Sequence, residues 1–271
     1  MNQRIKGLII ISLIAMLTAA LAGCHFYINL DNMKTVVGNG DMETKTVTLD
    51  QQLSGVKNMG SIDVVIDPSL TGEAIIEGES NLIDLIELRQ DTRGVLSVSY
   101  EDGTSIVLSK RMTVTIPAFS GGLIESNGSG CITLAGNEAM KGQTFDVQIG
   151  SSGDIALKLE AQTLSVNING SGTAELDVTA KALDAGIDGS GDIETAGTAD
   201  EISVSVNGSG CYNAFNCATK NADVGIYGSG NVNLNVSGKL TGSVNGSGDI
   251  TYEGSPSVSV SDQGSGDVQP R

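Results

Sequence analysis

The sequence contains no tryptophan, and aromatic residues make up only 3% of its 271 positions. We therefore do not expect a conventional globular core filled with bulky side chains. Valine, isoleucine and leucine are nevertheless frequent and evenly spread, which excludes a disordered chain. Together with 36 glycines, this composition predicts a narrow, regular and β-rich fold.

Histidine is almost absent as well, because His25 is the only one in the chain. Its place near the N-terminus leaves no basis for Ser-His-Asp or Cys-His catalysis. No cysteine and histidine cluster has the spacing of a zinc site, and no phosphate-binding loop ends in Gly-Lys-Ser or Gly-Lys-Thr. The sequence therefore predicts no catalytic residues, no metal site and no cofactor.

Positive charge is scarce. The chain has 15 Lys and Arg against 32 Asp and Glu, a formal net charge of −17. Nucleic-acid binding needs clustered Lys and Arg, so this class of function is excluded. The acidic balance also argues against docking of the protein surface on anionic lipid, and it suits solubility, cation binding or a basic partner.

The N-terminal segment is typical of an export signal rather than of a folded element. Arg4 and Lys6 precede an almost entirely apolar run over residues 7–21, too short for a stable membrane span. The run ends in Leu21-Ala22-Gly23-Cys24, which resembles the lipobox of bacterial lipoproteins. The resemblance implies cleavage before Cys24 and acylation of Cys24. We therefore expect a signal peptide at 1–23 and a lipidated tether at 24–43.

Such an anchor predicts that the protein sits on the cell membrane or the outer membrane, facing the periplasm or the cell exterior. With Cys24 assigned to lipid, Cys131, Cys211 and Cys217 remain, and an odd number cannot form a complete disulfide framework. Cys211 and Cys217 either pair or stay free as small, partly buried side chains. The sequence leaves this choice open.

The dominant pattern is a repeated Gly-Ser-Gly tripeptide, with Ser151-Ser152-Gly153 as a variant. The eight copies recur at intervals of 18 to 23 residues, most of them near 19. Alternating apolar residues precede each copy, such as Val166 and Ile168, and an apolar residue follows two positions later, with Tyr212 as the exception. Sustained self-similarity of this period indicates a solenoid.

One repeat predicts a strand, a glycine corner that turns through positive φ, a second strand and a small returning loop. A unit near 19 residues is too short for a strand-helix-strand unit or a propeller blade and fits one coil of a β-solenoid. We expect both ends of the stack to be capped, because open edges template aggregation. The predicted corner glycines are Gly128, Gly130, Gly153, Gly170, Gly172, Gly189, Gly191, Gly208, Gly210, Gly228, Gly230, Gly246, Gly248, Gly264 and Gly266.

The fold class is therefore all-β, a single-stranded β-helix with coils of about 19 residues at 126–271. Residues 44–125 carry less regular strand patterns and predict larger rungs that continue the stack and cap its start. A hairpin is expected from residues 86–90 and 95–100 across Asp91-Thr92-Arg93-Gly94. Residues 81–84 predict one helical turn capped by Asn81.

Two features resemble a known family. One is a strand over residues 60–66 followed by segments 73–78, 81–83 and 94–98, and the other is the train of Asn-Gly-Ser-Gly-Asp-Ile-like copies. Together they are similar to the auto-transporter adhesin head domain, also called the head GIN domain, from about Val47 to Val268. The resemblance implies a β-helix, residence at the cell envelope and an adhesive role, and it carries over no catalytic residues. The chain differs from an auto-transporter in its predicted lipid anchor and in lacking a C-terminal membrane-barrel pattern.

Carboxylates in the repeat offer an enzymatic alternative. Asp154, Asp192, Asp249 and Asp267 each follow a corner glycine, so they share one column of the stack, and Asp249 and Asp267 are expected roughly 5 Å apart on adjacent rungs. Such a pair suits a cation or a carbohydrate-cleaving site, although capping of each aspartate's own turn is the simpler interpretation. The spacing differs from calcium-binding nonapeptide repeats, and we assign no calcium site.

We expect a non-catalytic, adhesin-like binding or scaffold module for a glycan or an envelope protein, held on the membrane by its lipid anchor. The alternative is a carbohydrate-active enzyme, either a polysaccharide lyase or a glycosidase, with a carboxylate groove. A purely structural envelope protein is the third hypothesis. The sequence does not predict the oligomeric state.

Overall fold

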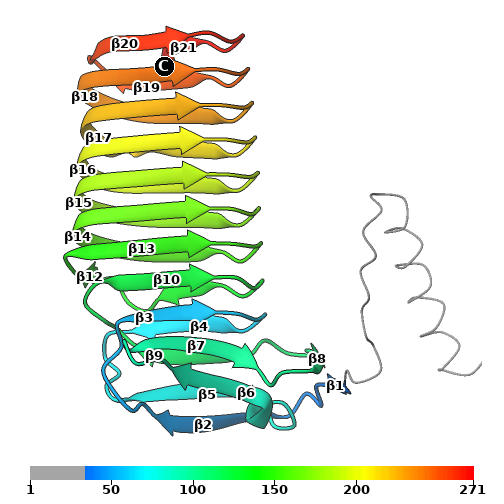
Figure 1. Cartoon of the computed structure of the whole chain (residues 1–271). Helices are drawn as coiled ribbons and strands as arrows, with labels where there is room; N and C mark the ends of the chain where they lie inside the picture. The colour runs from blue at the N-terminus through cyan, green and yellow to red at the C-terminus, as the bar shows by residue number, and fades with distance from the viewer. Residues whose placement is uncertain (1–33) are drawn as a thin grey trace, which may run out of the picture. The chain divides into compact units, whose positions relative to one another are not determined.

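The computed structural model describes residues 34–271, and nearly all regular structure in this part of the chain is β-strand. Strands from successive repeats stack in parallel to form a β-solenoid (Figure 1). Paired residues such as Ile155 and Ala174 are 19 positions apart, so the predicted β-solenoid with coils of about 19 residues is confirmed. The predicted signal peptide, Cys24 and His25 lie outside the described residues.

Each central rung is one long strand that begins after one glycine corner and ends before the next. The backbone keeps its pairing to the neighbouring rung through the opposite turn, as at Glu160 and Thr179. The predicted returning loop is therefore wrong for these rungs, because the turn itself belongs to the sheet. The five strands are β14 (Ile155–Ile168), β15 (Thr173–Ile187), β16 (Asp192–Val206), β17 (Cys211–Ile226) and β18 (Asn231–Val244).

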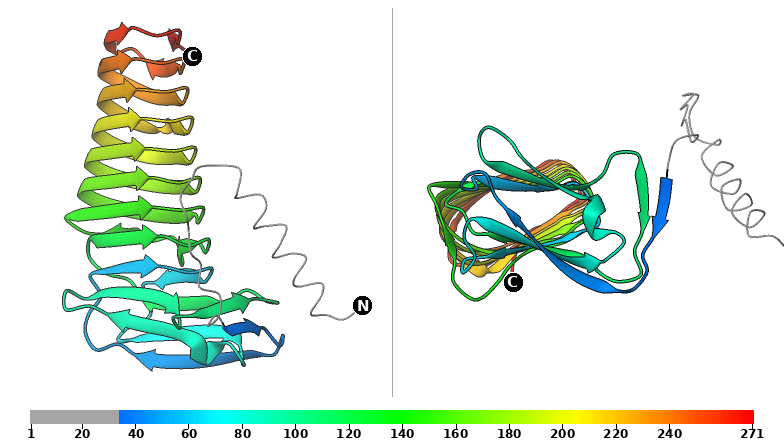
Figure 2. Two further views of the ribbon diagram at one scale, coloured as in Figure 1. Left: turned by 45° about the vertical axis from the view of Figure 1, so that its right-hand side comes forward. Right: turned by 90° about the horizontal axis from the view of Figure 1, so that it is seen from below.

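Viewed along its axis, the solenoid is a flattened oval with two broad faces (Figure 2). We call the face formed by strand segments that follow a glycine corner face A, and the face formed by segments that precede a corner face B. Inward side chains from both faces form the core, in columns of valine, isoleucine and leucine that run parallel to the axis. The rung before β14 is assembled from shorter pieces, β11 (Ile132–Leu134), β12 (Met140–Lys141) and β13 (Thr144–Ile149).

The corner glycines are required by stacking rather than by backbone conformation. None of the predicted corner glycines has a positive φ, so the expectation that they turn through the left-handed region was wrong. Neighbouring corners instead approach so closely that a β-carbon on Gly208 would overlap the carbonyl oxygen of Gly189, and Gly189 stands in the same relation to Gly170. Glycine is needed because two backbones meet there without room for a side chain.

Strands of the N-terminal half stack in an order that differs from their order in the chain. β3 pairs with β7 on one side and β10 on the other, and β4 lies in the same way between β9 and β11. The rung at residues 55–67 is thus inserted between two rungs that come later in the sequence. The strands not yet defined are β3 (Gly55–Asn58), β4 (Asp63–Asp67), β7 (Val95–Tyr100), β9 (Thr113–Pro117) and β10 (Gly122–Ser126).

Antiparallel strands close the N-terminal end of the solenoid. β2 (Met42–Thr48) pairs with β5 (Glu73–Glu79), and β5 pairs with β9. The predicted hairpin is confirmed, because β6 (Ile86–Gln90) pairs antiparallel with β7. A separate two-stranded sheet joins β1 (Lys34–Val37) to β8 (Thr104–Val107).

The predicted helical turn exists as a 3-10 turn over Ile83–Leu85, but its expected cap is wrong. The residue at the N-cap position is Leu82, and no side chain caps the turn. The Asn81 side chain instead accepts a hydrogen bond from the Asn39 N–H at 3.0 Å and donates to the Val37 carbonyl at 2.8 Å. Asn81 therefore holds the N-terminal segment rather than the turn.

The C-terminal end has no cap among the described residues, contrary to the expectation of two capped ends. β19 (Ile250–Gly254) and β20 (Ser257–Asp262) stack on β18, and β21 (Val268–Pro270) stacks on β19. β20 and β21 each pair with a strand on one side only. Asp262 occupies a column that holds isoleucine or valine in the six rungs before it. An inward charge and an edge proline both discourage further strand addition.

Candidate binding groove

The aspartates that follow the corner glycines lie in one column of face A and join neighbouring rungs. Asp154 accepts a hydrogen bond from the Thr173 backbone N–H at 2.9 Å, and Asp192 accepts one from the Cys211 N–H at 2.8 Å. Asp249 accepts the N–H of Asp267 in the same way at 2.8 Å. For these three aspartates the expectation that each caps its own turn was wrong, because the carboxylate accepts a hydrogen bond from the next rung.

Asp249 and Asp267, the predicted adjacent pair, are thus linked by a hydrogen bond from one backbone to the other side chain. Within residues 34–271, no group of three or more His, Cys, Asp or Glu side chains is placed to hold a metal ion. The aspartate column therefore stabilises the stacking of rungs. The aspartate carboxylates accept hydrogen bonds from backbone N–H groups at the corners, which would otherwise need water as a partner.

The cysteines of the repeat are free thiols. Cys217 is buried in the core while Cys211 lies in the aspartate column of face A, so these two residues do not form the disulfide that the sequence left open. Burial raises the pKa of both thiols. A raised pKa reduces the thiolate population and with it the reactivity of each cysteine.

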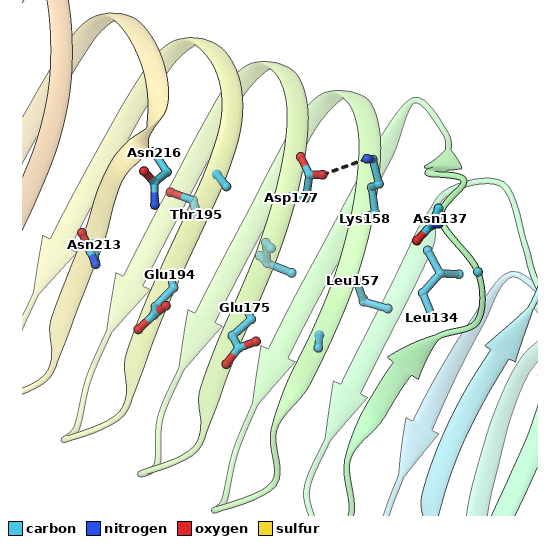
Figure 3. Close-up of a pocket in the computed structure, with 14 residues that line it drawn as sticks. Leu134, Asn137, Leu157, Lys158, Glu175, Asp177, Glu194, Thr195, Asn213 and Asn216 are labelled. Atoms are coloured by element: carbon cyan, nitrogen blue, oxygen red, sulfur yellow. Dashed lines mark ion pairs between the residues drawn. The ribbon is translucent and has the colours of Figure 1, made fainter.

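A groove with a volume of about 440 Å³ runs along face A across consecutive rungs, and we call it groove 1 (Figure 3). It spans five rungs, from the loop after β11 to β17, which corresponds to roughly 19 Å along the axis. Its floor is apolar and its walls carry carboxylates and carboxamides. Its lining includes Leu134, Asn137, Ala156, Leu157, Lys158, Glu175, Leu176, Asp177, Glu194, Thr195, Ala196, Asn213 and Asn216.

The regular stacking of the solenoid is disturbed at one end of groove 1. The register between β16 and β17 slips after Glu194, and the register between β17 and β18 slips after Ala214. Extra residues in β17 form a bulge that brings Asn216 beside Ala196. Bulges are common next to functional sites, where they re-aim side chains.

Polar side chains replace core residues beneath this bulge. Thr195 continues a column of leucines, Leu157 and Leu176, and Tyr212 continues a column of aliphatic residues. The Tyr212 hydroxyl lies 3.1 Å from the Thr195 hydroxyl, and both side chains are buried. Desolvation raises the pKa of Tyr212. Tyr212 was the exception in the sequence pattern, and its partner Thr195 explains how the core accepts it.

Charge in groove 1 is divided unequally. Lys158, the cationic residue of its lining, pairs with Asp177 at 2.9 Å. Glu175 and Glu194 make no ion pair with any described residue, and both point to the same side of the groove (Figure 3). The Asn213 side-chain oxygen is buried and finds no hydrogen-bond partner among residues 34–271. Groove 1 therefore presents two carboxylates without an ion-pair partner and one buried carboxamide oxygen without a donor.

Face B carries a second groove of about 530 Å³, which we call groove 2. Its central column alternates acidic and hydroxyl residues, Asp184, Ser203, Asp223 and Thr241. The Thr241 hydroxyl donates to Asp223 at 2.8 Å. The strands under this column keep their register on both sides of Ser203, so groove 2 lacks the bulge and the polar core that mark groove 1.

Hydrogen bonds join residues 38–41 to the N-terminal cap, which is formed by the antiparallel strands β2, β5 and β9. The sequence did not predict these bonds, because this stretch was expected to be a tether. The buried carboxylate of Glu79 accepts hydrogen bonds from the Ser109 hydroxyl, from the Ser109 and Lys110 N–H groups and from the Gly40 N–H. These hydrogen bonds lower the pKa of Glu79 to about 2, and the bond from the Ser109 hydroxyl has the largest effect. A glutamate in an alternating strand carries no sequence signal of this role.

These features define the class of protein: a parallel β-solenoid with an antiparallel cap and a polar groove along one face. The family model described as "Putative auto-transporter adhesin, head GIN domain" matches residues 52–256. The chain belongs to this family. A search of curated proteins found no match.

Solved structures share the fold. A putative adhesin from Parabacteroides distasonis has a TM-score of 0.79 at 21% identity, with 88% of this chain and 100% of that chain covered. A putative adhesin from Parabacteroides merdae has a TM-score of 0.78 at 23% identity, with coverages of 88% and 99%. A putative lipid binding protein from Parabacteroides distasonis has a TM-score of 0.74 at 23% identity, with coverages of 88% and 100%.

No helix within residues 34–271 is long and apolar enough to span a membrane.

Proposed function

We propose that this protein is a lipid-anchored, non-catalytic adhesin-like module of the cell envelope, and that groove 1 is its contact surface for a glycan or an envelope protein. Membership of an adhesin family supports the adhesive role. The lipobox-like Leu21-Ala22-Gly23-Cys24 supports attachment through Cys24 to the cell membrane or the outer membrane.

One observation carries the assignment of the surface. Groove 1 includes a departure from register, with a bulge at β17 and a buried acceptor on Asn213 that has no partner in the described chain. A buried polar atom without a hydrogen bond is costly, and its position at the bulge supports a role for Asn213 in contact with a partner. Groove 2 has comparable volume, and the strands at its central column keep their register on both sides of Ser203.

The test uses cells that display the full chain at matched surface density. A groove 1 variant combines Glu175→Gln, Glu194→Gln and Asn213→Ala, and a control variant combines Asp184→Asn, Glu201→Gln and Ser203→Ala on face B. Retention of cells on plates coated with the envelope fraction of the same bacterium is measured. We expect the groove 1 variant to fall to the level of cells without the protein and the control variant to match the wild type. Equal retention of both variants would reject groove 1 as the contact surface.

The alternative of a carbohydrate-active enzyme predicts a different result in the same material. Glu175 and Glu194 lie side by side on adjacent strands, a spacing of roughly 5 Å that also suits a retaining glycosidase. We expect no increase in reducing ends or unsaturated products when the protein is incubated with envelope polysaccharide. Product release that Glu194→Gln abolishes would contradict a non-catalytic role.

A further inference from the structure

Three side chains of groove 1 form a ladder of hydrogen-bond acceptors. Glu175 pairs in register with Glu194, and Glu194 pairs with Asn213, so the three lie on consecutive rungs spaced about 4.8 Å apart. Figure 3 shows them in one row along the groove. Ionised carboxylates only accept hydrogen bonds, and the Asn213 oxygen is also an acceptor. A ligand that satisfies this ladder must present donors at regular intervals.

The charges of the groove disfavour an anionic ligand. Lys158 is neutralised by Asp177 at 2.9 Å, and Glu175 and Glu194 stay without an opposite charge among the described residues. A uronate or phosphate polymer would be repelled by the two carboxylates. The partner is therefore neutral or cationic.

The remaining lining favours a neutral partner. The buried Asn213 oxygen requires a directed donor rather than a charge, and Asn137 and Asn216 add amides that both donate and accept. Glu175 and Glu194 are solvent-exposed, so ion pairs with them would contribute little. Hydroxyl groups both donate and accept hydrogen bonds, so they can bind the carboxylates as well as the amides of the groove.

The shape and floor of groove 1 favour a linear chain of sugar rings. The groove is open along its length and crosses five rungs, so its dimensions suit an extended polymer rather than a single small molecule. Ala156 and Ala196 form the accessible apolar floor between the polar walls, and the buried Leu157 and Leu176 lie beneath it. A pyranose ring presents apolar C–H faces and polar hydroxyl edges, which match this division.

We infer that groove 1 binds a neutral, linear polysaccharide that lies parallel to the solenoid axis, with successive sugar hydroxyls donating to Glu175, Glu194 and Asn213. This inference rests on groove 1 being the contact surface of the adhesin-like module. It adds the chemical class of the partner, its direction along the solenoid and the groups that recognise it.

Isothermal titration calorimetry on the full chain in detergent tests the inference, with cellohexaose, maltohexaose and chitohexaose as neutral probes, and hexagalacturonate and hexalysine as charged probes. We expect at least one neutral hexasaccharide to bind, its trisaccharide to bind at least tenfold more weakly, and the charged probes not to bind. Asn213→Ala should weaken the hexasaccharide by about 3–10-fold. Glu194→Gln should weaken it less, because the amide keeps an acceptor, while the face B change Glu201→Gln should have no effect.

Binding of hexalysine or hexagalacturonate in preference to every neutral probe would overturn the inference, as would hexasaccharide binding that Asn213→Ala leaves unchanged. Failure of the inference is separable from failure of the proposed function. If no neutral probe binds but the groove 1 variant still loses cell retention, the surface is correct and its partner is not a neutral glycan. Melting curves of Asn213→Ala provide the folding control, since this oxygen makes no bond within the described chain.

Discussion

At the residue scale, close approach of backbones explains the repeated glycines better than conformational freedom does. The corner glycines avoid the left-handed region, and each lies against the carbonyl of the corner one rung away. The periodicity of the sequence was therefore a correct guide to where the corners lie, and it did not give the physical reason. Local sequence cannot do so, because the clash involves residues about 19 positions apart.

A single added methyl group at such a corner should lower the stability of the stacked rungs. Gly208→Ala places a β-carbon against the Gly189 carbonyl, and overpacking of this kind costs about 1–3 kcal/mol. We expect a lower midpoint of urea unfolding. Ser209→Ala, at the exposed tip of the same corner, is the matched control and should shift the midpoint little. Equal midpoints for the two variants would show that the rungs separate without cost.

Glu79 should make the cap sensitive to acid. Hydrogen bonds lower the pKa of this buried carboxyl from its ordinary 4.5 to about 2. Between these two pKa values the folded protein binds fewer protons at Glu79 than the unfolded chain does. The stabilising effect of Glu79 is therefore complete above about pH 4.5 and is lost as the pH falls toward 2. We expect the wild type to melt higher than Glu79→Gln by a constant margin from pH 5 to 8, and the margin to shrink between pH 4.5 and 2. A margin independent of pH down to 2 would contradict this role.

At the scale of elements, the repeat predicted the parallel coils well and the order of the N-terminal strands poorly. Alternation in segments such as Val204 and Val206 reports which side chains face inward, because it depends only on neighbours in the chain. The insertion of residues 55–67 between later rungs depends on long-range pairing, which leaves no periodic trace. The hydrogen bonds at Glu79 escaped prediction for the same reason, since their donors come from residues 40, 109 and 110.

The candidate site was predicted in part. Sequence reasoning placed the polar residues in outward columns and named the aspartates, which the structure assigns to bonds between rungs. It did not identify Glu175, Glu194 or Asn213. The only available signal was the exception at Tyr212, which marks the rung where β17 bulges and the core becomes polar.

The open end of the solenoid gives a prediction for β20. Asp262 stands in a column of isoleucine and valine, and its carboxylate accepts a hydrogen bond from the Gly264 N–H. We expect this charge at the open edge to oppose addition of another strand to β20. Asp262→Val should raise the association of the protein with itself, seen as a larger sedimentation coefficient at equal concentration. Ser261→Val adds the same side chain on the outward face and should associate no more than the wild type. If both variants sediment alike, the inward aspartate does not protect the edge.

At the scale of the molecule, a solenoid whose rungs contact only their neighbours should be least stable where one neighbour is missing. β20 and β21 pair on one side, whereas β15 and β16 pair on both. Hydrogen exchange followed by mass spectrometry should therefore show faster exchange of amides in 257–270 than in 173–206. Uniform protection from end to end would indicate one cooperative unit.

The central claim is that groove 1, and not the opposite face, meets the partner of this adhesin-like module. A photoreactive benzoylphenylalanine replacing Ala196 lies in groove 1, and the same residue replacing Ser203 lies in groove 2. After irradiation of intact cells that carry the full chain, we predict a covalent adduct at position 196 and none at position 203. An adduct at 203 with none at 196 would contradict the account.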